Sequence, residues 1–189
     1  MSFHAYIAGG VLVLSGLVTV YYYNKIVKLE NRVDNAWAQI DVQLKKRADL
    51  VPNLVETVEG YMEHEREVMD NVSESRERMM NAQSAEEEAQ AGNDLGNALK
   101  SLFAVAEDYP DLKASENFKE LQQELSSIEN KIAYARQHYN DAIMTFNNAI
   151  ETFPAVMFAN LFGKSEREQL QIETADKELP EVDFQDEEQ

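Results

Sequence analysis

Apolar residues fill the first part of the chain without interruption. Residues 5–23 contain no charged side chain, and Lys25 is the first lysine or arginine. A helix of this length spans roughly 30 Å, the thickness of the hydrocarbon core of a bilayer. The pattern therefore predicts a transmembrane helix over 5–23, preceded by a stub of residues 1–4. The residues assigned to this membrane anchor are Ala5, Tyr6, Val11, Leu12, Leu14, Leu17, Val20, Tyr21, Tyr22 and Tyr23.

The residues that flank the span predict its topology. A cleaved signal peptide is disfavoured, because no basic region precedes the apolar run and three tyrosines, not small residues, end it. Lys25, Lys28 and Arg32 follow the span. Basic residues next to a span favour the cytoplasmic side. We therefore expect a single-pass protein of the cell membrane, with its C-terminal domain in the cytoplasm.

A second apolar pattern has the period of a helix and lies near the C-terminus. Its steps alternate between three and four residues over about five heptads, which is typical of a helix packed along a core. Ser115 offers an N-terminal cap, and Pro154 stops the pattern, so we expect a helix over about 116–153. Its apolar positions are Phe118, Leu121, Leu125, Ile128, Ile132, Ala135, Tyr139, Ala142, Phe146, Ala149 and Phe153.

A third pattern follows the membrane span, and Pro52 interrupts it. Proline inside a helix removes one hydrogen bond and clashes with the preceding turn. We favour a break near 49–52, which gives two helices; the alternative is one kinked helix from 24 to about 82. The apolar positions before the proline are Ile26, Leu29, Val33, Trp37, Ile40 and Leu44, and those around and beyond it are Val51, Val55, Val58 and Met62.

One more helix is predicted over 85–108. Ser84 followed by Glu87 is a capping-box pattern at its start, and Tyr109-Pro110 ends it. Short connections between helices favour antiparallel neighbours. We therefore predict an all-α fold, in which residues 24–163 form an antiparallel up-and-down bundle of three to four long helices. The residues assigned to its core are Trp37, Ile40, Leu44, Leu99, Phe118, Leu121, Leu125, Ile128, Ile132, Tyr139 and Phe146.

The residues after Pro154 divide into two parts. A short apolar stretch ends at Gly163, and it either caps the end of the bundle or lies on the membrane surface; we favour capping. Residues 164–189 carry ten acidic and three basic side chains, so we expect a solvated, partly disordered tail.

Composition excludes several classes of function. The chain has no cysteine, and its 35 acidic residues against 17 basic ones give a formal net charge of -18. Such a surface repels nucleic acid, so we expect no nucleic-acid binding. The acidity is explained by solubility or by a salty cytoplasm, or else by recognition of a basic partner.

The chain offers little for catalysis. A di-metal site in a bundle needs Glu-x-x-His pairs, and neither His64 nor His138 completes one. Glu56, Glu59 and Glu63 form an acidic stripe typical of a solvated face. We therefore predict no catalytic residue, no metal and no cofactor. Asparagines beside core positions either fix helix register or lie on the surface; they are Asn31, Asn35, Asn130, Asn140 and Asn147.

Several stretches resemble one protein family. They are VDNAWAQIDVQLKKRADLVPNLVETVEGY over 33–61, YPDLKASENF over 109–118, IAYARQHYN over 132–140 with Phe153-Pro154, and LPEVDF over 179–184. Together they resemble the LemA family over nearly the whole chain. The resemblance implies an N-terminal anchor, an antiparallel helical bundle and a cytoplasmic body, and it implies no cofactor or catalytic residue. The polar residues from Lys164 depart from the apolar, aromatic sequence typical of that family.

Taken together, these patterns predict a non-enzymatic interaction or scaffold module held at the lipid bilayer. Its protein partners are not identified by the sequence. One alternative is a metal- or ligand-dependent enzyme that uses bundle carboxylates. Another is a structural membrane protein that self-assembles as a homo-oligomer.

Overall fold

The structure of the protein is a computed structural model that describes residues 2–170. The predictions made for the tail beyond residue 170, including the stretch 179–184, lie outside the described residues. The part that is described is helical and contains no strand, which confirms the predicted all-α fold. Its six helices are α1 (Ser2–Glu59), α2 (Arg66–Met80), α3 (Ala85–Ala106), α4 (Pro110–Ala114), α5 (Glu116–Glu151) and α6 (Ala155–Leu161).

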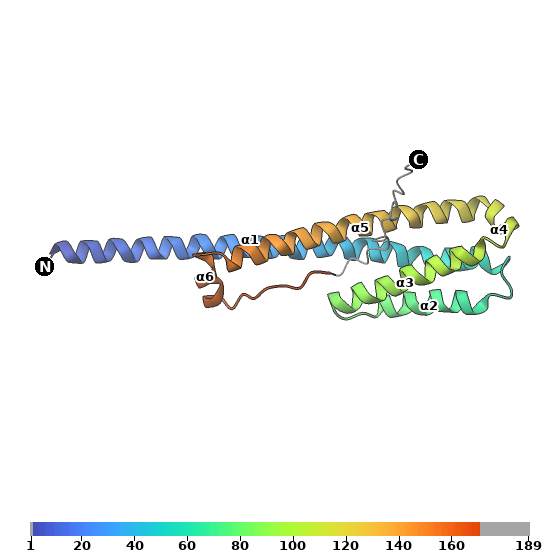
Figure 1. Cartoon of the computed structure of the whole chain (residues 1–189), viewed down its shortest axis with the longest axis horizontal. Coiled ribbons are helices and arrows are strands. Elements are labelled where there is room, and N and C mark those ends of the chain that lie inside the picture. The colour runs from blue at the N-terminus through green and yellow to red at the C-terminus, as the bar shows by residue number, and fades with distance from the viewer. Residues whose placement is uncertain (1, 171–189) are drawn as a thin grey trace, which may run out of the picture.

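The longest helices, α1 and α5, lie side by side and run in opposite directions (Figure 1). The hairpin of α2 and α3 packs beside the C-terminal half of α1 (Figure 1). The short helix α4 leads into α5 at that end of the bundle, and α6 lies at the opposite end. The N-terminal part of α1 projects beyond all the other helices (Figure 1).

The apolar core has two parts. The larger one joins α1, α2, α3, α4 and α5, and the smaller one joins α1, α5 and α6. Trp37 and Tyr139 lie where the two parts meet, with ring centroids 5.5 Å apart in an edge-to-face arrangement. Such a pair adds about 0.5–1.5 kcal/mol beyond its burial. The smaller core consists of Ile26, Leu29, Val33, Ile143, Phe146, Ile150 and Ala159.

The favoured break near 49–52 is wrong, because α1 continues through Pro52 to Glu59. Val51 and Leu54 are buried on the core side, whereas Pro52 is exposed. The proline therefore lies on the solvent side of the helix, where its ring displaces no core side chain. The alternative of one helix to residue 82 is also wrong, since α1 and α2 are separated by a turn over 60–65.

The predicted helix over 116–153 corresponds to α5, with two differences. Ser115 does not cap it through its side chain, because α4 immediately precedes it. Phe153 lies beyond the end of α5 and is 81% exposed, so the heptad pattern no longer applies to it. In the last turns, Ile143 and Ile150 are buried, while the predicted Ala142 and Ala149 are only partly buried. A straight α-helix drifts relative to a strict heptad, which moves its buried stripe by one residue.

The predicted helix over 85–108 corresponds to α3, and its capping box is present in altered form. Ser84 Oγ accepts a hydrogen bond from the Glu87 N–H at 3.2 Å. The Glu87 carboxylate accepts from the N–H of Gln83 at 2.9 Å, one residue before the cap.

Most of the residues assigned to the core are buried in the structure. Trp37, Leu121 and Tyr139 are the exceptions, since each is only partly buried against the larger core. The buried residues are Ile40, Leu44, Leu99, Phe118, Leu125, Ile128, Ile132 and Phe146.

Candidate functional site

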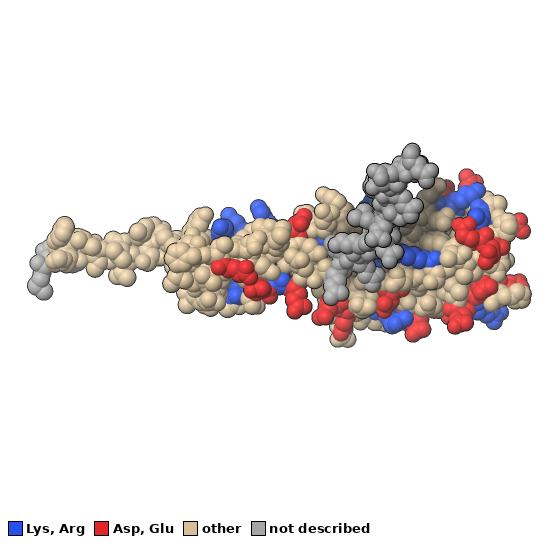
Figure 2. Space-filling view, viewed as in Figure 1, with Lys and Arg blue, Asp and Glu red and all other residues tan. Residues whose placement is uncertain are grey.

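The projecting part of α1 is the first candidate site. Within the described residues, α1 is the one helix long and apolar enough to cross a membrane, and the apolar window lies near the N-terminus with none of it buried. Figure 2 shows no charged side chain on this part of the helix. Lys25, Lys28 and Arg32, which follow it, are exposed. This long apolar helix suggests a membrane anchor.

The anchor residues are exposed with one exception. Tyr22 is partly buried, because it contacts α6. The side chain of Ala5 lies outside the described part of the chain. The exposed anchor residues are Tyr6, Val11, Leu12, Leu14, Leu17, Val20, Tyr21 and Tyr23.

Helix α6 packs where the anchor meets the bundle. Phe158 stacks on Tyr22 with ring centroids 5.0 Å apart, and Phe162 meets Tyr23 edge-on at the same distance. Gly163 ends the helix with φ of 64°, and the N–H of Lys164 donates to the Ala159 carbonyl at 2.9 Å. This is the closing hydrogen bond of a Schellman motif. The predicted stop at Gly163 is therefore confirmed.

The two faces of α6 differ. Ala155 and Ala159 are buried against α1 and α5. Phe153, Met157 and Leu161 are spaced by four residues, and they are 81%, 63% and 71% exposed. The favoured capping role therefore agrees with the buried face, while an apolar stripe is left uncovered at the end of the anchor.

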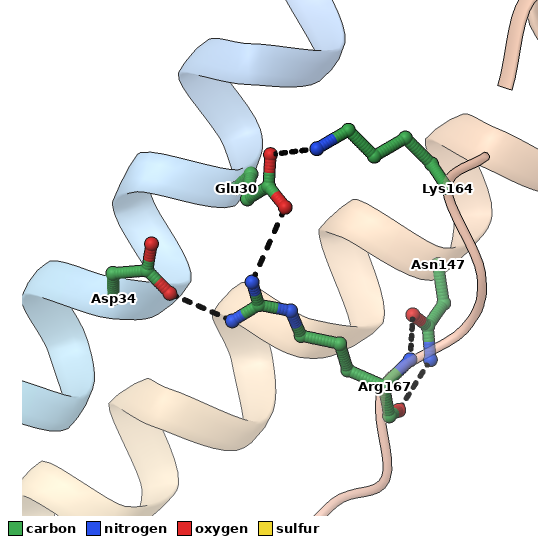
Figure 3. Close-up of polar contacts among 5 residues, drawn as sticks. All are labelled: Glu30, Asp34, Asn147, Lys164 and Arg167. Carbon is green, nitrogen blue, oxygen red and sulfur yellow. Dashed lines mark hydrogen bonds and ion pairs between the residues drawn. The ribbon is translucent and has the colours of Figure 1, made fainter. Parts of the chain in front are cut away.

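Residues 164–170 form the most organised polar contacts of the molecule, and we call them the strap. They belong to the predicted acidic tail, and they lie along α1 and α5 with every third residue, Lys164, Arg167 and Leu170, partly buried. Lys164 Nζ lies 2.5 Å from the Glu30 carboxylate (Figure 3). Arg167 binds both Asp34, at 2.7 Å, and Glu30, at 3.3 Å. Desolvation of Arg167 is outweighed by Asp34 and Glu30, which raise its pKa.

Two asparagines of α5 bind the backbone of the strap. Asn147 Nδ2 donates to the Arg167 carbonyl at 2.9 Å, and its Oδ1 accepts from the Arg167 N–H at 3.0 Å (Figure 3). Asn140 makes the same pair of bonds with Leu170, each at 2.9 Å. Each asparagine amide thus makes the pair of hydrogen bonds that a residue of a neighbouring strand makes in a β-sheet. Asn140 and Asn147 lie seven residues apart on a helix, and Arg167 and Leu170 lie three residues apart on an extended segment. Both separations are about 10 Å, so both asparagines meet a strap residue.

Of the two alternatives for these asparagines, the structure favours a surface position for three of them. Asn31, Asn35 and Asn130 are exposed. Asn140 and Asn147 are partly buried, and they fix the strap, not the pairing of two helices. The sequence signal was their separation by one heptad beside the core positions of α5.

A buried arginine, which sequence reasoning missed, joins three helices. Arg47 of α1 is 2% exposed, and its Nη1 lies 2.6 Å from the carboxylate of Glu129 on α5. It also donates to the carbonyl of Gly92 on α3. A Cβ at Gly96 would lie only 3.2 Å from Arg47 Nη1, so α3 makes room with glycine. The signal in the sequence was Gly92 and Gly96, one turn apart in an otherwise helix-favouring segment.

A second polar contact links α1 to α3. Burial and the neighbouring Asp41 carboxyl raise the pKa of Glu88 to about 7. The hydrogen bond from Glu88 lowers the pKa of Asp41, which also pairs with Lys45 at 2.5 Å. These two carboxyls are therefore a candidate source of pH dependence.

The residues that the structure describes contain no group of three or more His, Asp or Glu side chains placed to hold a metal ion. His64 and His138 are exposed and lie on different helices or turns. Glu56, Glu59 and Glu63 are exposed as well. The strap is held by Glu30 and Asp34 of α1 and by Asn140, Phe146 and Asn147 of α5, and we call these five residues the clamp.

These features define a class: an all-helical bundle protein whose long N-terminal helix carries a candidate membrane anchor. The model of the LemA family matches residues 36–184. The protein belongs to the LemA family.

Several proteins are similar to this chain in sequence. Protein LemA of Metamycoplasma hominis is 26% identical over 165 residues, which cover 81% of this chain and 74% of that protein. Magnetosome protein MamQ of Magnetospirillum gryphiswaldense is 24% identical over 75% of this chain and 61% of its own length. MamQ 2 of Paramagnetospirillum magneticum is 34% identical over 45% of this chain, but the match spans only 31% of that relative.

Proposed function

We propose that this protein is a single-pass, membrane-anchored interaction module that has no enzymatic activity and holds its helical bundle at the cytoplasmic face of the cell membrane. The observation that carries the proposal is the continuity of α1. One helix supplies both an exposed apolar half and a half that forms the bundle core. Because α1 has no break, the position of the anchor in the bilayer fixes the position of the bundle next to it.

The apolar residues in and next to α6 support this arrangement. Phe158 and Phe162 pack on Tyr22 and Tyr23, which end the apolar span, while Met157 and Leu161 of α6 and the preceding Phe153 are exposed. Aromatic rings and apolar side chains favour the boundary between headgroups and acyl chains. The exposed Lys25 and Lys28 follow directly, as expected for the cytoplasmic side.

The surface of the bundle supports binding to protein, not chemistry. Acidic side chains are distributed over the bundle (Figure 2), which favours partners with basic segments. A groove between α1 and α5 is lined by Val42 and Tyr134, which are 47% and 72% exposed. Exposed apolar residues of this size are typical of contact surfaces.

The membrane topology is tested with introduced thiols, because the chain has no cysteine of its own. Ser2→Cys places a thiol in the stub, and Ser127→Cys places one on the exposed face of α5. In intact cells, we expect a membrane-impermeant maleimide to label Ser2→Cys but not Ser127→Cys. Labelling of Ser127→Cys before permeabilisation would contradict the proposed orientation.

The interaction role is tested by affinity purification from detergent-solubilised membranes, with mass spectrometry of the retained proteins. The matched control is the double variant Val42→Lys and Tyr134→Lys, which changes exposed side chains only. We expect a small set of proteins that the control loses. Stoichiometric iron, manganese or zinc in the purified protein would instead favour the metal-dependent alternative. A large homogeneous particle with no other protein would favour self-assembly.

A further inference from the structure

The clamp binds the strap mainly through features that any extended peptide possesses. Asn140 and Asn147 hold the N–H and carbonyl of single residues, and neither asparagine contacts the side chain of the residue it holds through these bonds. Binding of this kind recognises the extended backbone of a segment, as β-strand addition does. The spacing of the asparagines sets the register, and the surrounding charges set which sequences fit.

We propose that the clamp is a docking site for an extended, basic segment of a partner protein, and that the strap occupies this site as an internal competitor. The inference deepens the proposed function and rests on it, since it names the partner class of the interaction module. The partner segment carries an arginine opposite Asn147. It carries a basic residue three positions earlier and an apolar residue three positions later.

The charges of the clamp define this preference. Glu30 lies within reach of two cations, because it binds both Lys164 at 2.5 Å and Arg167 at 3.3 Å. Asp34 adds a second carboxylate at 2.7 Å from Arg167. The arginine also lies over the ring of Phe146, with Cζ 5.8 Å from the centroid. Arginine satisfies a planar carboxylate pair and an aromatic face together, which lysine does not.

The third position of the segment is apolar. Leu170 packs against the larger core and is only partly buried there. It lines the same groove as Trp37 and Tyr139, between α5 and the hairpin of α2 and α3. An apolar residue at this position of a partner segment meets the same two aromatic side chains.

The strap itself is an imperfect ligand. Glu166 lies against Glu151 of α5, and a hydrogen bond between the two carboxyls together with their like charges raises the pKa of Glu151. The strap forms no helix, and Phe162 and Gly163 join it to α6. Like charges in contact weaken binding, and a segment without secondary structure of its own leaves its site at low cost. A partner segment with a neutral residue in place of Glu166 avoids this repulsion.

The strap competes efficiently in spite of these defects, because it is tethered. A segment joined to its site by a short connection has an effective concentration on the order of millimolar. A strap whose own intrinsic dissociation constant is about 0.1 mM therefore weakens the binding of any free peptide about tenfold. Removal of the strap contacts therefore produces a measurable gain in affinity.

The experiment uses the full-length protein in nanodiscs and a fluorescein-labelled peptide. The peptide has the sequence of residues 163–171 with glutamine in place of Glu166 and Glu168, and binding is followed by fluorescence anisotropy. The opened variant combines Lys164→Ser, Arg167→Ser and Leu170→Ser, all in the strap. The single variant Arg167→Ser is measured beside it, so that the test stands if the triple variant does not fold.

We expect the opened variant to bind the peptide about tenfold more tightly than wild type, with Arg167→Ser between them. In the opened variant, Asn147→Asp removes the Nδ2 donor and should weaken binding at least tenfold. The control Asn148→Asp makes the same change at the exposed neighbouring residue and should leave binding unchanged. This set of results would establish the docking site.

Other outcomes would overturn the inference. Equal affinity of all strap variants, or equal effects of Asn147→Asp and Asn148→Asp, would mean that the peptide binds elsewhere. Loss of stability in the opened variant without any peptide binding would make the strap a structural element only. A dimer that dissociates when the strap is changed would make a second copy the occupant. None of these results affects anchoring, which incorporation into the nanodisc reports separately.

Discussion

The Nε of Arg76 on α2 donates a hydrogen bond of 2.8 Å to the backbone carbonyl of Ala48 on α1. Ala48 lies four residues before Pro52, whose nitrogen carries no hydrogen, so α1 cannot pair this carbonyl itself. Ala48 is fully buried. An unpaired buried carbonyl costs about 1–3 kcal/mol, so α2 supplies the bond that the proline removes.

Arg76→Met should therefore lower the free energy of unfolding by about 1–3 kcal/mol. Methionine keeps much of the side-chain length and loses the donor. The measurement is urea unfolding of the full-length protein in detergent, followed by circular dichroism. The control Arg78→Met, at a residue of α2 whose side chain is 52% exposed, should change stability by less than about 0.5 kcal/mol.

A double variant separates this bond from simple loss of packing. Pro52→Ala restores the N–H that pairs with Ala48 within α1. In that background, the loss caused by Arg76→Met should shrink by about 1 kcal/mol, since the carbonyl keeps a partner. Equal losses in the two backgrounds would contradict the compensation.

This contact explains why one part of the fold could not be predicted from the sequence. The apolar period remained in phase across Pro52 and correctly indicated one helix, but the local rule for proline favoured a break. The hydrogen bond from Arg76 compensates for the proline, and because Arg76 belongs to another helix, no local sequence pattern indicates it. The long helices α3 and α5 were predictable, because apolar period and prolines agreed there and Ser84 also marked the start of α3.

Much less of the candidate site could be predicted. The asparagines at positions 140 and 147 attracted attention through their spacing, but their partners lie 20 to 30 residues away in a segment without periodicity. The acidic composition from residue 164 onward predicted a solvated tail. It gave no sign that Lys164 and Arg167 would pair with Glu30 and Asp34. Contacts of this kind depend on tertiary placement, which composition does not encode.

The ion pair of Arg47 and Glu129 leads to a second prediction, because its partners are unequally buried. Arg47 is 2% exposed, whereas the side chain of Glu129 is 47% exposed. Glu129→Ala leaves a buried charge unpaired and should cost about 2–4 kcal/mol. Arg47→Met leaves a carboxylate that water can solvate, and it should cost less than about 2 kcal/mol.

Chemical unfolding in detergent measures which of the two variants, Glu129→Ala or Arg47→Met, loses more stability. Glu124→Ala is the control for the change in helix propensity, since Glu124 is exposed on the same helix. It should leave stability within about 0.5 kcal/mol of wild type. If Arg47→Met proved the more damaging of the two, the pair would not be governed by burial of the arginine.

The contact between Glu88 and Asp41 predicts a dependence of stability on pH. The pKa of Glu88 is raised from 4.5 to about 7 in the folded protein. The folded state therefore holds this proton more tightly than the unfolded state does. The stabilising contribution is complete below about pH 4.5 and is lost as the pH rises through 7. The depressed pKa of Asp41 acts in the opposite sense and only at lower pH.

Thermal melting of the full-length protein between pH 5 and 8 tests this prediction. Wild type should lose stability over this range, and Glu88→Gln should give a flatter profile, because glutamine cannot lose a proton. The matched control is Glu86→Gln, at an exposed residue two positions earlier in α3. It should retain the slope of wild type. A slope that survives in Glu88→Gln would assign the pH dependence to other groups.

The exposed stripe of α6 predicts where this helix lies relative to the bilayer. The protein has a single tryptophan, Trp37, which is partly buried in the bundle. Met157→Trp adds a second one on the exposed face of α6, and Tyr61→Trp adds one at an exposed position of the turn between α1 and α2. In liposomes that contain brominated lipid, the emission gained with Met157→Trp should be strongly quenched, because the ring lies among the acyl chains. The emission gained with Tyr61→Trp should resist quenching, since that turn lies at the end of the bundle away from the anchor (Figure 1). Equal quenching of the two would mean that α6 caps the bundle without touching the membrane.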